Sequence, residues 1–289
     1  MAASLARMDT LVSTDWLAHA IESGDVVVLD ATAHATDPTR DARAEFAAGH
    51  IPGARFLDLA TLKDSGSPVP NALPTSEQVA ARLSALGIAR PDAVVLYDDS
   101  AVKTSARAWF MLRMNGLAQV AILDGGIAKW KAEGRPIENG EANAAPTEAP
   151  TLTADWRRVR TKDQMLANIS DAGEQVIDAR DAGRFTGETV DTVHGLPGGH
   201  IPGARNLFFR DLYNADGTFR SDDELRAAFE RAGVDLSRPI AASCGSGVTA
   251  SVLLFALHRL GIEDAALYDG SWSEWGADPA TPKETGAAA

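Results

Sequence analysis

The chain has 289 residues, of which 45% are hydrophobic, and it carries a formal net charge of −13 at pH 7. This composition can fill the cores of two ordinary domains, so it excludes a mostly disordered protein. The acidic balance disfavours nucleic acid as a partner, and no run of about 18 apolar residues could span a membrane.

Cysteine and histidine usage narrows the class of protein further. Cys244 is the only cysteine, and the six histidines form no H-x-x-x-H pair. We therefore expect no disulfide and no metal site. Residues 1–13 lack the continuous apolar stretch of a secretory signal, so the sequence predicts a protein of the reducing cytoplasm.

The first half alternates short apolar runs with helical stretches. A strand is expected at 26–31 and a second at 93–99. Between them, Thr75 and Gln78 have the spacing of a capping box, which predicts a helix over 76–86. Buried runs that alternate with helices are typical of a parallel sheet with helices on both faces.

The chain contains an internal repeat. The sequence "GHIPGAR" occurs at Gly49–Arg55 and again at Gly199–Arg205. Residues 139–151, rich in Ala, Pro, Asn and Glu, have the composition of an extended linker. We therefore expect two α/β domains, 1–138 and 152–289, which arose by duplication.

The second half repeats the alternation of the first. A capping box at Ser221 and Glu224 predicts a helix over 222–232. The expected strands are Val176–Asp178, Pro239–Ser243 and Ala265–Tyr268. We expect Trp272 and Trp275, three residues apart, to be core or cleft-lining side chains, and Arg180 to be structural.

A tight turn around Cys244 joins a strand to the helix that starts near Thr249. Ligands bind at this carboxyl edge in open α/β sheets. Gly245 and Gly247 permit positive φ angles, so backbone N–H groups can converge, and the helix N-terminus adds partial positive charge. Both effects favour a thiolate, which predicts a reactive sulfur in an anion cradle; the alternative is an inert buried cysteine.

The residue at position 250 separates two thiolate chemistries. In tyrosine phosphatases, five residues separate the cysteine from an arginine whose guanidinium binds phosphate through two hydrogen bonds. This chain has Ala250 there. Phosphatase activity is therefore not expected, and the turn favours sulfur transfer.

These features resemble the rhodanese superfamily, whose tandem domains each carry "GHIPGA" and whose second domain holds the cysteine. The sequences "CGSGVTA" at 244–250 and "YDGSWSEWG" at 268–276 resemble its 3-mercaptopyruvate sulfurtransferase branch. The resemblance runs from about Leu11 to Pro279. It implies two tandem rhodanese-like domains, each a parallel sheet flanked by helices on both faces.

The resemblance implies covalent catalysis in two half-reactions that needs no metal or organic cofactor. Cys244 takes sulfur from 3-mercaptopyruvate as a persulfide, pyruvate leaves, and a thiol such as thioredoxin, or cyanide, accepts the sulfur. Ser246 either polarises the substrate or is a small loop residue. The backbone groups expected to hold the anionic sulfur belong to Gly245, Gly247, Val248 and Thr249.

Substrate binding requires a local cation in this acidic chain. The resemblance assigns the substrate carboxylate to Arg184, although a solvated arginine paired with Asp181 or Glu188 is the alternative. The family usually has a second arginine where this chain has Val193. We expect His194 or a residue of the first domain to compensate; otherwise the substrate differs.

The first domain is expected to be catalytically silent. Counting from the two "DG" sequences places Asp99 at the position of Cys244, and a carboxylate cannot carry a persulfide. The resemblance makes Asp41 and His50 candidates for assisting the chemistry. Since His200 duplicates His50, the stronger interpretation is that His50 braces the turn that follows it.

Two other functions remain open at this point. One is a thiosulfate sulfurtransferase, although such enzymes generally carry basic side chains in the loop and this loop has none. The other is a non-catalytic module that carries a persulfide or binds a partner protein.

Overall fold

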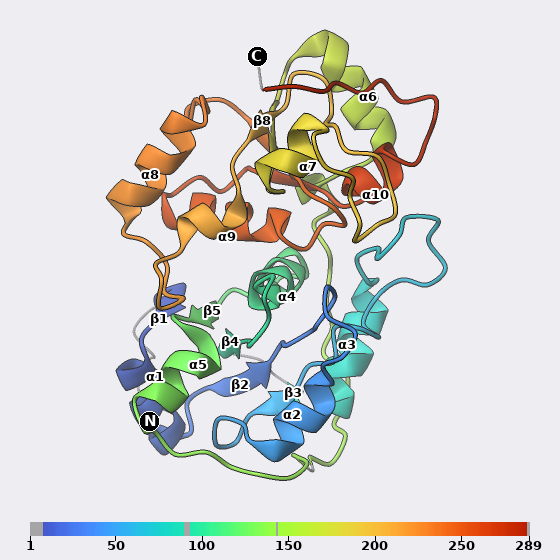
Figure 1. Ribbon diagram of the computed structural model, residues 1–289. Coiled ribbons are helices and arrows are strands. Elements are labelled where there is room, and N and C mark those ends of the chain that lie inside the picture. The colour runs from blue at the N-terminus through green and yellow to red at the C-terminus, as the bar shows by residue number, and fades with distance from the viewer. Residues whose placement is uncertain (1–7, 90–92, 143, 288–289) are drawn as a thin grey trace. The chain divides into compact units, whose positions relative to one another are not determined.

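The computed structural model describes residues 8–89, 93–142 and 144–287, so most of the amino-terminal stretch searched for a signal lies outside it (Figure 1). The chain forms two compact units. Unit 1 comprises the residues up to Lys63, Pro74–Asp155 and Ala215–Phe219; unit 2 comprises Asp64–Leu73, Trp156–Asn214 and Arg220 onward. Each unit thus includes a short segment from the other half of the chain. The boundaries expected from the sequence contain no such exchange.

Unit 1 is built on a five-stranded parallel sheet in the order β1-β5-β4-β2-β3 (Figure 1). Every strand is short and largely buried, as expected for a sheet covered on both faces. The strands are β1 (Leu11–Val12), β2 (Val27–Asp30), β3 (Arg55–Phe56), β4 (Val94–Tyr97) and β5 (Val120–Leu123).

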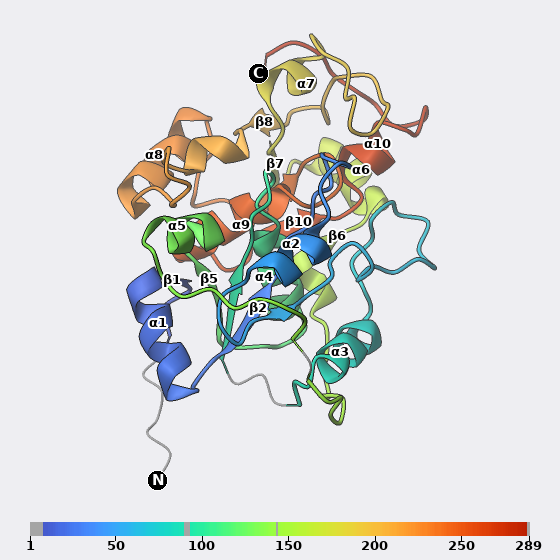
Figure 2. The ribbon, with the colours of Figure 1, turned by 60° about the horizontal axis from the view of Figure 1, so that its bottom comes forward.

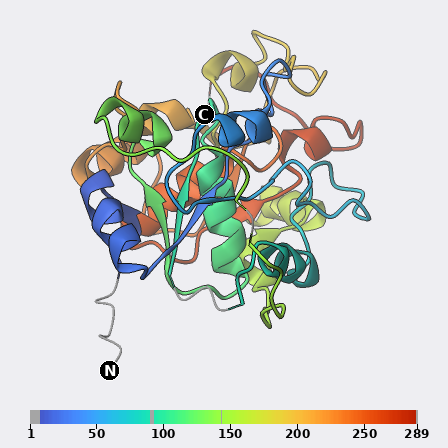
Figure 3. The same cartoon turned by 90° about the horizontal axis from the view of Figure 1, so that it is seen from below.

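Helices cover both faces of this sheet. On one face, Leu17, Phe46 and Trp130 from three helices pack together with Val95 and Tyr97 of β4. Helix α4 packs directly against strands β4 and β5 (Figure 3). The helices are α1 (Thr14–Ser23), α2 (Ala42–Ala48), α3 (Ser76–Ala85), α4 (Thr104–Met114) and α5 (Gly126–Ala132).

Unit 2 repeats this topology with the strand order β6-β10-β9-β7-β8, again all parallel (Figure 2). The two units therefore share one strand order, in agreement with the repeat in the sequence. The strands are β6 (Val159–Arg160), β7 (Gln175–Asp178), β8 (Arg205–Asn206), β9 (Ile240–Ser243) and β10 (Ala266–Tyr268).

The helices of unit 2 also lie on both faces of their sheet. Met165, Phe185, Trp272 and Trp275 form one buried cluster with strand residues, which confirms both tryptophans as core. Helix α9 packs on β9 and β10 (Figure 2). The helical elements are η1 (Trp156–Arg158), α6 (Lys162–Asp171), α7 (Ala182–Thr186), η2 (Phe209–Leu212), α8 (Asp222–Arg231), α9 (Ala250–Arg259) and α10 (Ser271–Trp275).

Local sequence signals set several helix starts. Thr75 with Gln78 and Ser221 with Glu224 both form the capping boxes that the sequence predicts. None of the helices in the described part of the chain combines the length and apolar character of a bilayer span.

Candidate functional site

Cys244 lies where β9 ends and the connection to α9 begins. Its neighbour Ser243 pairs in register with Asp178, the last residue of β7, so the cysteine emerges at the carboxyl edge of the sheet. Only 1% of its surface is exposed. The strand, glycine-containing turn and helix follow one another as the sequence predicts.

The turn that begins α10 fixes the backbone on both sides of the cysteine. The Trp272 N–H donates to the Cys244 carbonyl oxygen at 3.0 Å, and the Ser273 N–H donates to the Gly245 carbonyl oxygen at 2.8 Å. The Cys244 N–H donates to Ser271 Oγ at 3.1 Å. The Ser271 hydroxyl also lies 4.0 Å from Cys244 Sγ, so this turn contacts the cysteine through main chain and side chain.

Ser271 has a left-handed backbone with φ +49°, a conformation that residues other than glycine rarely adopt. In unit 1 the equivalent residue, two positions after the aspartate of "DG", is Gly126, with φ +58°. Unit 2 therefore keeps a hydroxyl where glycine would fit the backbone with less strain. The only signal for Ser271 in the sequence is its alignment with Gly126.

The two loop glycines are required for different reasons. Gly247 has φ +77°, as the sequence predicts. Gly245 does not have a positive φ, so that expectation is wrong for it. Instead, a Cβ atom at Gly245 would lie 2.2 Å from His194 Cε1 and 3.0 Å from each ring nitrogen. Glycine is needed at 245 because the His194 ring lies against it.

Asp191 holds His194 in this position. His194 Nδ1 lies 3.0 Å from Asp191 Oδ1, and Asp191 is fully buried. Burial alone would raise the pKa of Asp191, but the hydrogen bond from His194 and the charges of His194 and Arg184 outweigh it and hold the pKa below its usual value. Asp191 belongs to no motif that singles it out in the sequence.

Arg184, on α7, joins the same cluster. Its Nε donates to Asp181 Oδ2 at 2.6 Å, and Nη1 lies 3.5 Å from Asp191 Oδ1. The pairing with Asp181 that was one of the alternatives is therefore present, together with a second carboxylate. Arg184, Asp191 and His194 are here called the acid–base cluster, and its member His194 contacts the Cys244 loop at Gly245. Val193 points to solvent with 47% of its surface exposed.

Arg180 is a second arginine of this region, and it is almost fully buried. Its guanidinium donates to Asp178 and to the Gly199 carbonyl oxygen, and it lies 4.5 Å from the centre of the Trp272 ring. Burial would lower the pKa of Arg180, but the charge of Asp178, the hydrogen bond to it and the charge of Asp191 outweigh burial and raise the pKa. Arg180 thus has the structural role expected from the sequence.

The helix that follows the loop begins without a side-chain cap. Its N-cap residue Thr249 makes no capping hydrogen bond, whereas Ser221 caps α8. The N–H groups that such a cap usually binds donate to backbone carbonyl oxygens instead, Ser251 to Val248 at 3.2 Å and Val252 to Thr249 at 3.1 Å. The partial positive charge of the helix N-terminus lies at the end of the Cys244 loop.

Strand register identifies the counterpart of Cys244 in unit 1. Asp30 of β2 pairs with Tyr97 in the way that Asp178 pairs with Ser243, so the equivalent residue is the one after Tyr97, which is Asp98. The expectation of Asp99 is wrong by one position. The reason is that unit 1 has one more residue than unit 2 between this position and its "DG" turn.

Asp98 is a buried anion held by backbone N–H groups. Its Oδ1 accepts from the Ser100 N–H and its Oδ2 accepts from the Ser105 N–H, both at 2.8 Å. Ser105 lies in the first turn of α4. The connection from strand to helix in unit 1 therefore binds a carboxylate that the chain itself supplies.

Asp41 and His50 both have structural partners in unit 1. Asp41 caps α2 by accepting from the Ala44 N–H at 3.1 Å. The His50 ring stacks on Phe46 with centroids 3.9 Å apart, and its Nδ1 lies 2.9 Å from the Phe46 carbonyl oxygen. The main-chain N–H of His50 donates to the Glu138 carbonyl oxygen at 2.9 Å.

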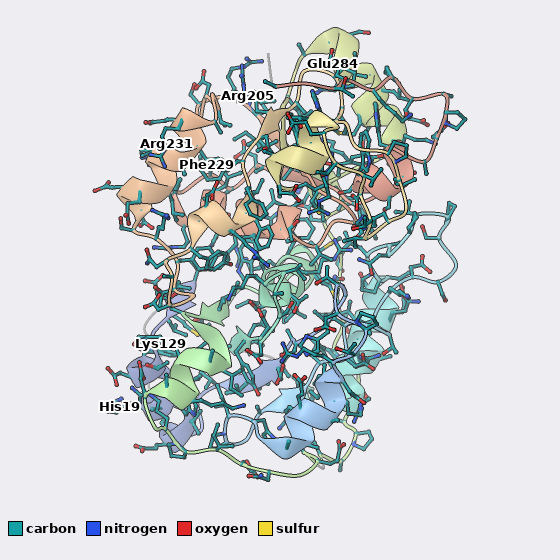
Figure 4. All side chains as sticks on the ribbon, in the orientation of Figure 1. His19, Lys129, Arg205, Phe229, Arg231 and Glu284 are labelled. Carbon is teal, nitrogen blue, oxygen red and sulfur yellow. The ribbon has the colours of Figure 1, made fainter. Side chains whose placement is uncertain are left out.

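The same arrangement recurs in unit 2. The His200 N–H donates to the carbonyl oxygen of Glu284, labelled in Figure 4, at 2.9 Å. The carboxylate of Glu284 accepts from the Gly203 N–H at 3.0 Å, as that of Glu138 does from the Gly53 N–H at 2.8 Å. We therefore interpret both histidines as braces of the "HIPG" turns.

Comparisons with known proteins agree with this geometry. The family model "Rhodanese-like domain" matches residues 13–133 and 161–278. The chain is 39% identical over 274 residues to a 3-mercaptopyruvate sulfurtransferase of Escherichia coli, covering 94% of this chain and 97% of that one. It is 38% identical over 300 residues to thiosulfate/3-mercaptopyruvate sulfurtransferase 2 of Arabidopsis thaliana, covering 97% and 88%. The crystal structure of SseA from Escherichia coli, described as a 3-mercaptopyruvate sulfotransferase, superposes with a TM-score of 0.81 at 36% identity, covering 92% and 99%.

Proposed function

Because the chain belongs to the rhodanese family, we propose that it is a sulfurtransferase that moves sulfur from 3-mercaptopyruvate to a thiol acceptor through Cys244. The observation that carries this proposal is the equivalence of Cys244 and Asp98. In unit 1 this position holds an anion on two backbone N–H groups. The same fold in unit 2 puts a sulfur there, and a thiolate or a persulfide is an anion that such a loop stabilises.

In the first half-reaction, the Cys244 thiolate attacks the thiol sulfur of 3-mercaptopyruvate. The sulfur–sulfur bond forms as the carbon–sulfur bond breaks, and its electron pair goes to the enolate of pyruvate. The thiol proton of the donor ends on the methyl carbon, so a persulfide anion and pyruvate result. In the second half-reaction an acceptor takes the outer sulfur, and the electron pair returns to Sγ.

The acid–base cluster supplies the substrate contacts in this proposal. Arg184 binds the carboxylate of the donor, and His194 takes the place of the arginine that is missing at Val193. Asp191 orients the imidazole through Nδ1, so Nε2 is the ring nitrogen available to the substrate. The contact of the ring with Gly245 supports a role directly beside the sulfur.

The loop itself supplies the remaining contacts. The anionic sulfur lies among N–H groups of Gly245, Gly247, Val248 and Thr249, and the Ser246 hydroxyl polarises the donor. Asp41 and His50 are not included, because their partners in unit 1 account for them. The acceptor is a thiol such as thioredoxin, with cyanide as a laboratory substitute, and a single cysteine suits a reducing compartment such as the cytoplasm.

The rival function is transfer from thiosulfate, which the name of the Arabidopsis relative includes. The loop from Cys244 to Thr249 contains no basic side chain to meet a dianion. Thiocyanate formation from each donor, with cyanide in excess, separates the two. We expect the higher kcat/KM with 3-mercaptopyruvate, and a preference for thiosulfate would overturn the proposed donor. Absence of turnover with either donor would favour a non-catalytic module.

A further inference from the structure

We propose that residues 64–73 are a functional part of unit 2 and that Asn71 is a positioning residue for the Cys244 loop. These residues come from the first half of the chain but fold as part of unit 2. The proposal rests on the proposed function only in taking the Cys244 loop as the reactive site.

The first observation is a direct contact with the loop. Asn71 Nδ2 donates to the carbonyl oxygen of Ser246 at 3.1 Å. Ser246 is two residues from Cys244, in the middle of the turn. Asn71 has φ +56°, and asparagine is among the side chains that tolerate this conformation best. Its backbone is therefore shaped to present the amide to the loop.

The second observation is an anchor on the turn opposite the loop. The Leu73 N–H donates to Asp269 Oδ2 at 2.7 Å, and both residues are buried. Asp269 lies two residues before Ser271, which accepts from the Cys244 N–H. Segment 64–73 thus contacts both turns that hold the cysteine.

Unit 1 contains the matching anchor. There the Phe219 N–H, from the exchanged segment 215–219, donates to Asp124 Oδ1 at 2.8 Å. Asp124 and Asp269 are the aspartates of the two "DG" turns. Anchoring an exchanged segment on this aspartate is therefore a feature of both units, and in unit 2 the anchored segment continues to the reactive loop.

The contact with Ser246 sets the direction of one N–H group in the loop. In a trans peptide the carbonyl oxygen and the following N–H point to opposite sides of the chain. Holding the Ser246 oxygen toward Asn71 therefore turns the Gly247 N–H away from Asn71. The positive φ of Gly247 is compatible with this orientation. Asn71 thus fixes one of the donors that the proposed mechanism directs at the sulfur.

Two variants remove the contact while keeping the backbone. Asn71→Gly retains the left-handed conformation and deletes the amide, whereas Asn71→Asp keeps the shape and replaces the donor with a carboxylate beside a carbonyl oxygen. Losing a hydrogen bond of ordinary strength corresponds to a rate loss of about three- to tenfold. We expect that loss in kcat for N71G and a larger one for N71D, with KM changed less.

The rate of alkylation of Cys244 by iodoacetamide at pH 7 provides a readout that needs no sulfur donor. It should fall in the same order as kcat. The matched control is Asp124→Asn, which weakens the equivalent anchor in unit 1 and should leave the alkylation rate unchanged, whatever its effect on Tm. The proposal would be overturned if both Asn71 variants were alkylated at the wild-type rate, or if D124N lost as much of the alkylation rate as they do. If the wild type transfers no sulfur, but alkylation still slows from the wild type to N71G and further to N71D, only the proposed function is overturned.

Discussion

The carboxylate of Asp98 in unit 1 occupies the place that the thiol of Cys244 holds in unit 2. Both residues follow the strand that pairs with the aspartate ending β2 or β7. In unit 1 the carboxylate is satisfied by N–H groups of the chain. In unit 2, under the proposed function, the anion is a sulfur that accepts and releases a second sulfur atom. The two units thus present a closed and, as we propose, a reactive version of the same loop.

Substitutions at Cys244 test this relationship. Cys244→Asp reproduces unit 1, and we expect it to be folded, unable to transfer sulfur, and no less stable to heat than Cys244→Ala. Without an anion cradle, the buried carboxylate would instead cost several kcal/mol. Thermal unfolding at pH 7 measures the difference between C244D and C244A. A Tm of C244D far below that of C244A would contradict the anion cradle. Sulfur transfer by Cys244→Ser would contradict Cys244 as the residue that carries the sulfur.

His194 is expected to bind the donor in place of an arginine at position 193. Because hydrogen bonds to charged groups are worth about 1.5–3 kcal/mol, His194→Ala should raise KM for 3-mercaptopyruvate about tenfold or more. Val193→Ala is the matched control, since that side chain is exposed and should not contribute. Val193→Arg in the H194A background should restore part of the lost affinity. Steady-state kinetics that show an unchanged KM in H194A would remove His194 from the site.

The contact between His194 and Gly245 predicts a coupling between the two positions. Gly245→Ala places a methyl group 2.2 Å from the ring, so the ring must move and transfer should be impaired. In H194A the space is empty, and the same glycine substitution should cost much less. A double-mutant cycle on kcat/KM should therefore be strongly non-additive. Additive losses would show that the alanine acts through the loop backbone and not through the histidine.

The elements and the reactive loop could be predicted because their signals are local. Capping boxes, short apolar runs and a strand followed by Cys244 and glycine lie within a few residues of what they specify. The contacts of Asn71 with Ser246 and of His194 with Gly245 could not be predicted, since both residues reach the loop from distant parts of the chain. The choice between Asp98 and Asp99 needed strand register, which counting from a landmark cannot supply when a loop differs by one residue. Gly245 was correctly singled out but for the wrong physical reason, because His194 cannot be placed beside it from the sequence.

Ser271 should trade stability against function. Ser271→Gly removes the strain of a left-handed serine, about 1–2 kcal/mol, and also the hydroxyl that accepts from the Cys244 N–H, about 1 kcal/mol. We therefore expect a Tm within a few degrees of the wild type but slower persulfide formation. Single-turnover release of pyruvate measures the second effect. Unchanged turnover in a folded S271G protein would mean that the hydroxyl has no part in holding the sulfur.

Asp30, the unit 1 counterpart of Asp178, should make stability depend on pH. Burial raises the pKa of Asp30 to about 6, from 3.8 for the ordinary side chain. A carboxyl group whose pKa is raised in the folded state stabilises the protein when protonated, so this contribution is present below pH 4 and is lost as the pH rises to about 6. The shift corresponds to as much as about 3 kcal/mol. Asp30→Asn keeps an oxygen that can accept from the Thr32 N–H but cannot ionise, so it should lack this part of the pH dependence. Urea unfolding of both proteins at pH 4.5 and pH 7 gives the change in the free energy of unfolding between these two pH values. An equal change in D30N and the wild type would show that Asp30 is not the titrating group.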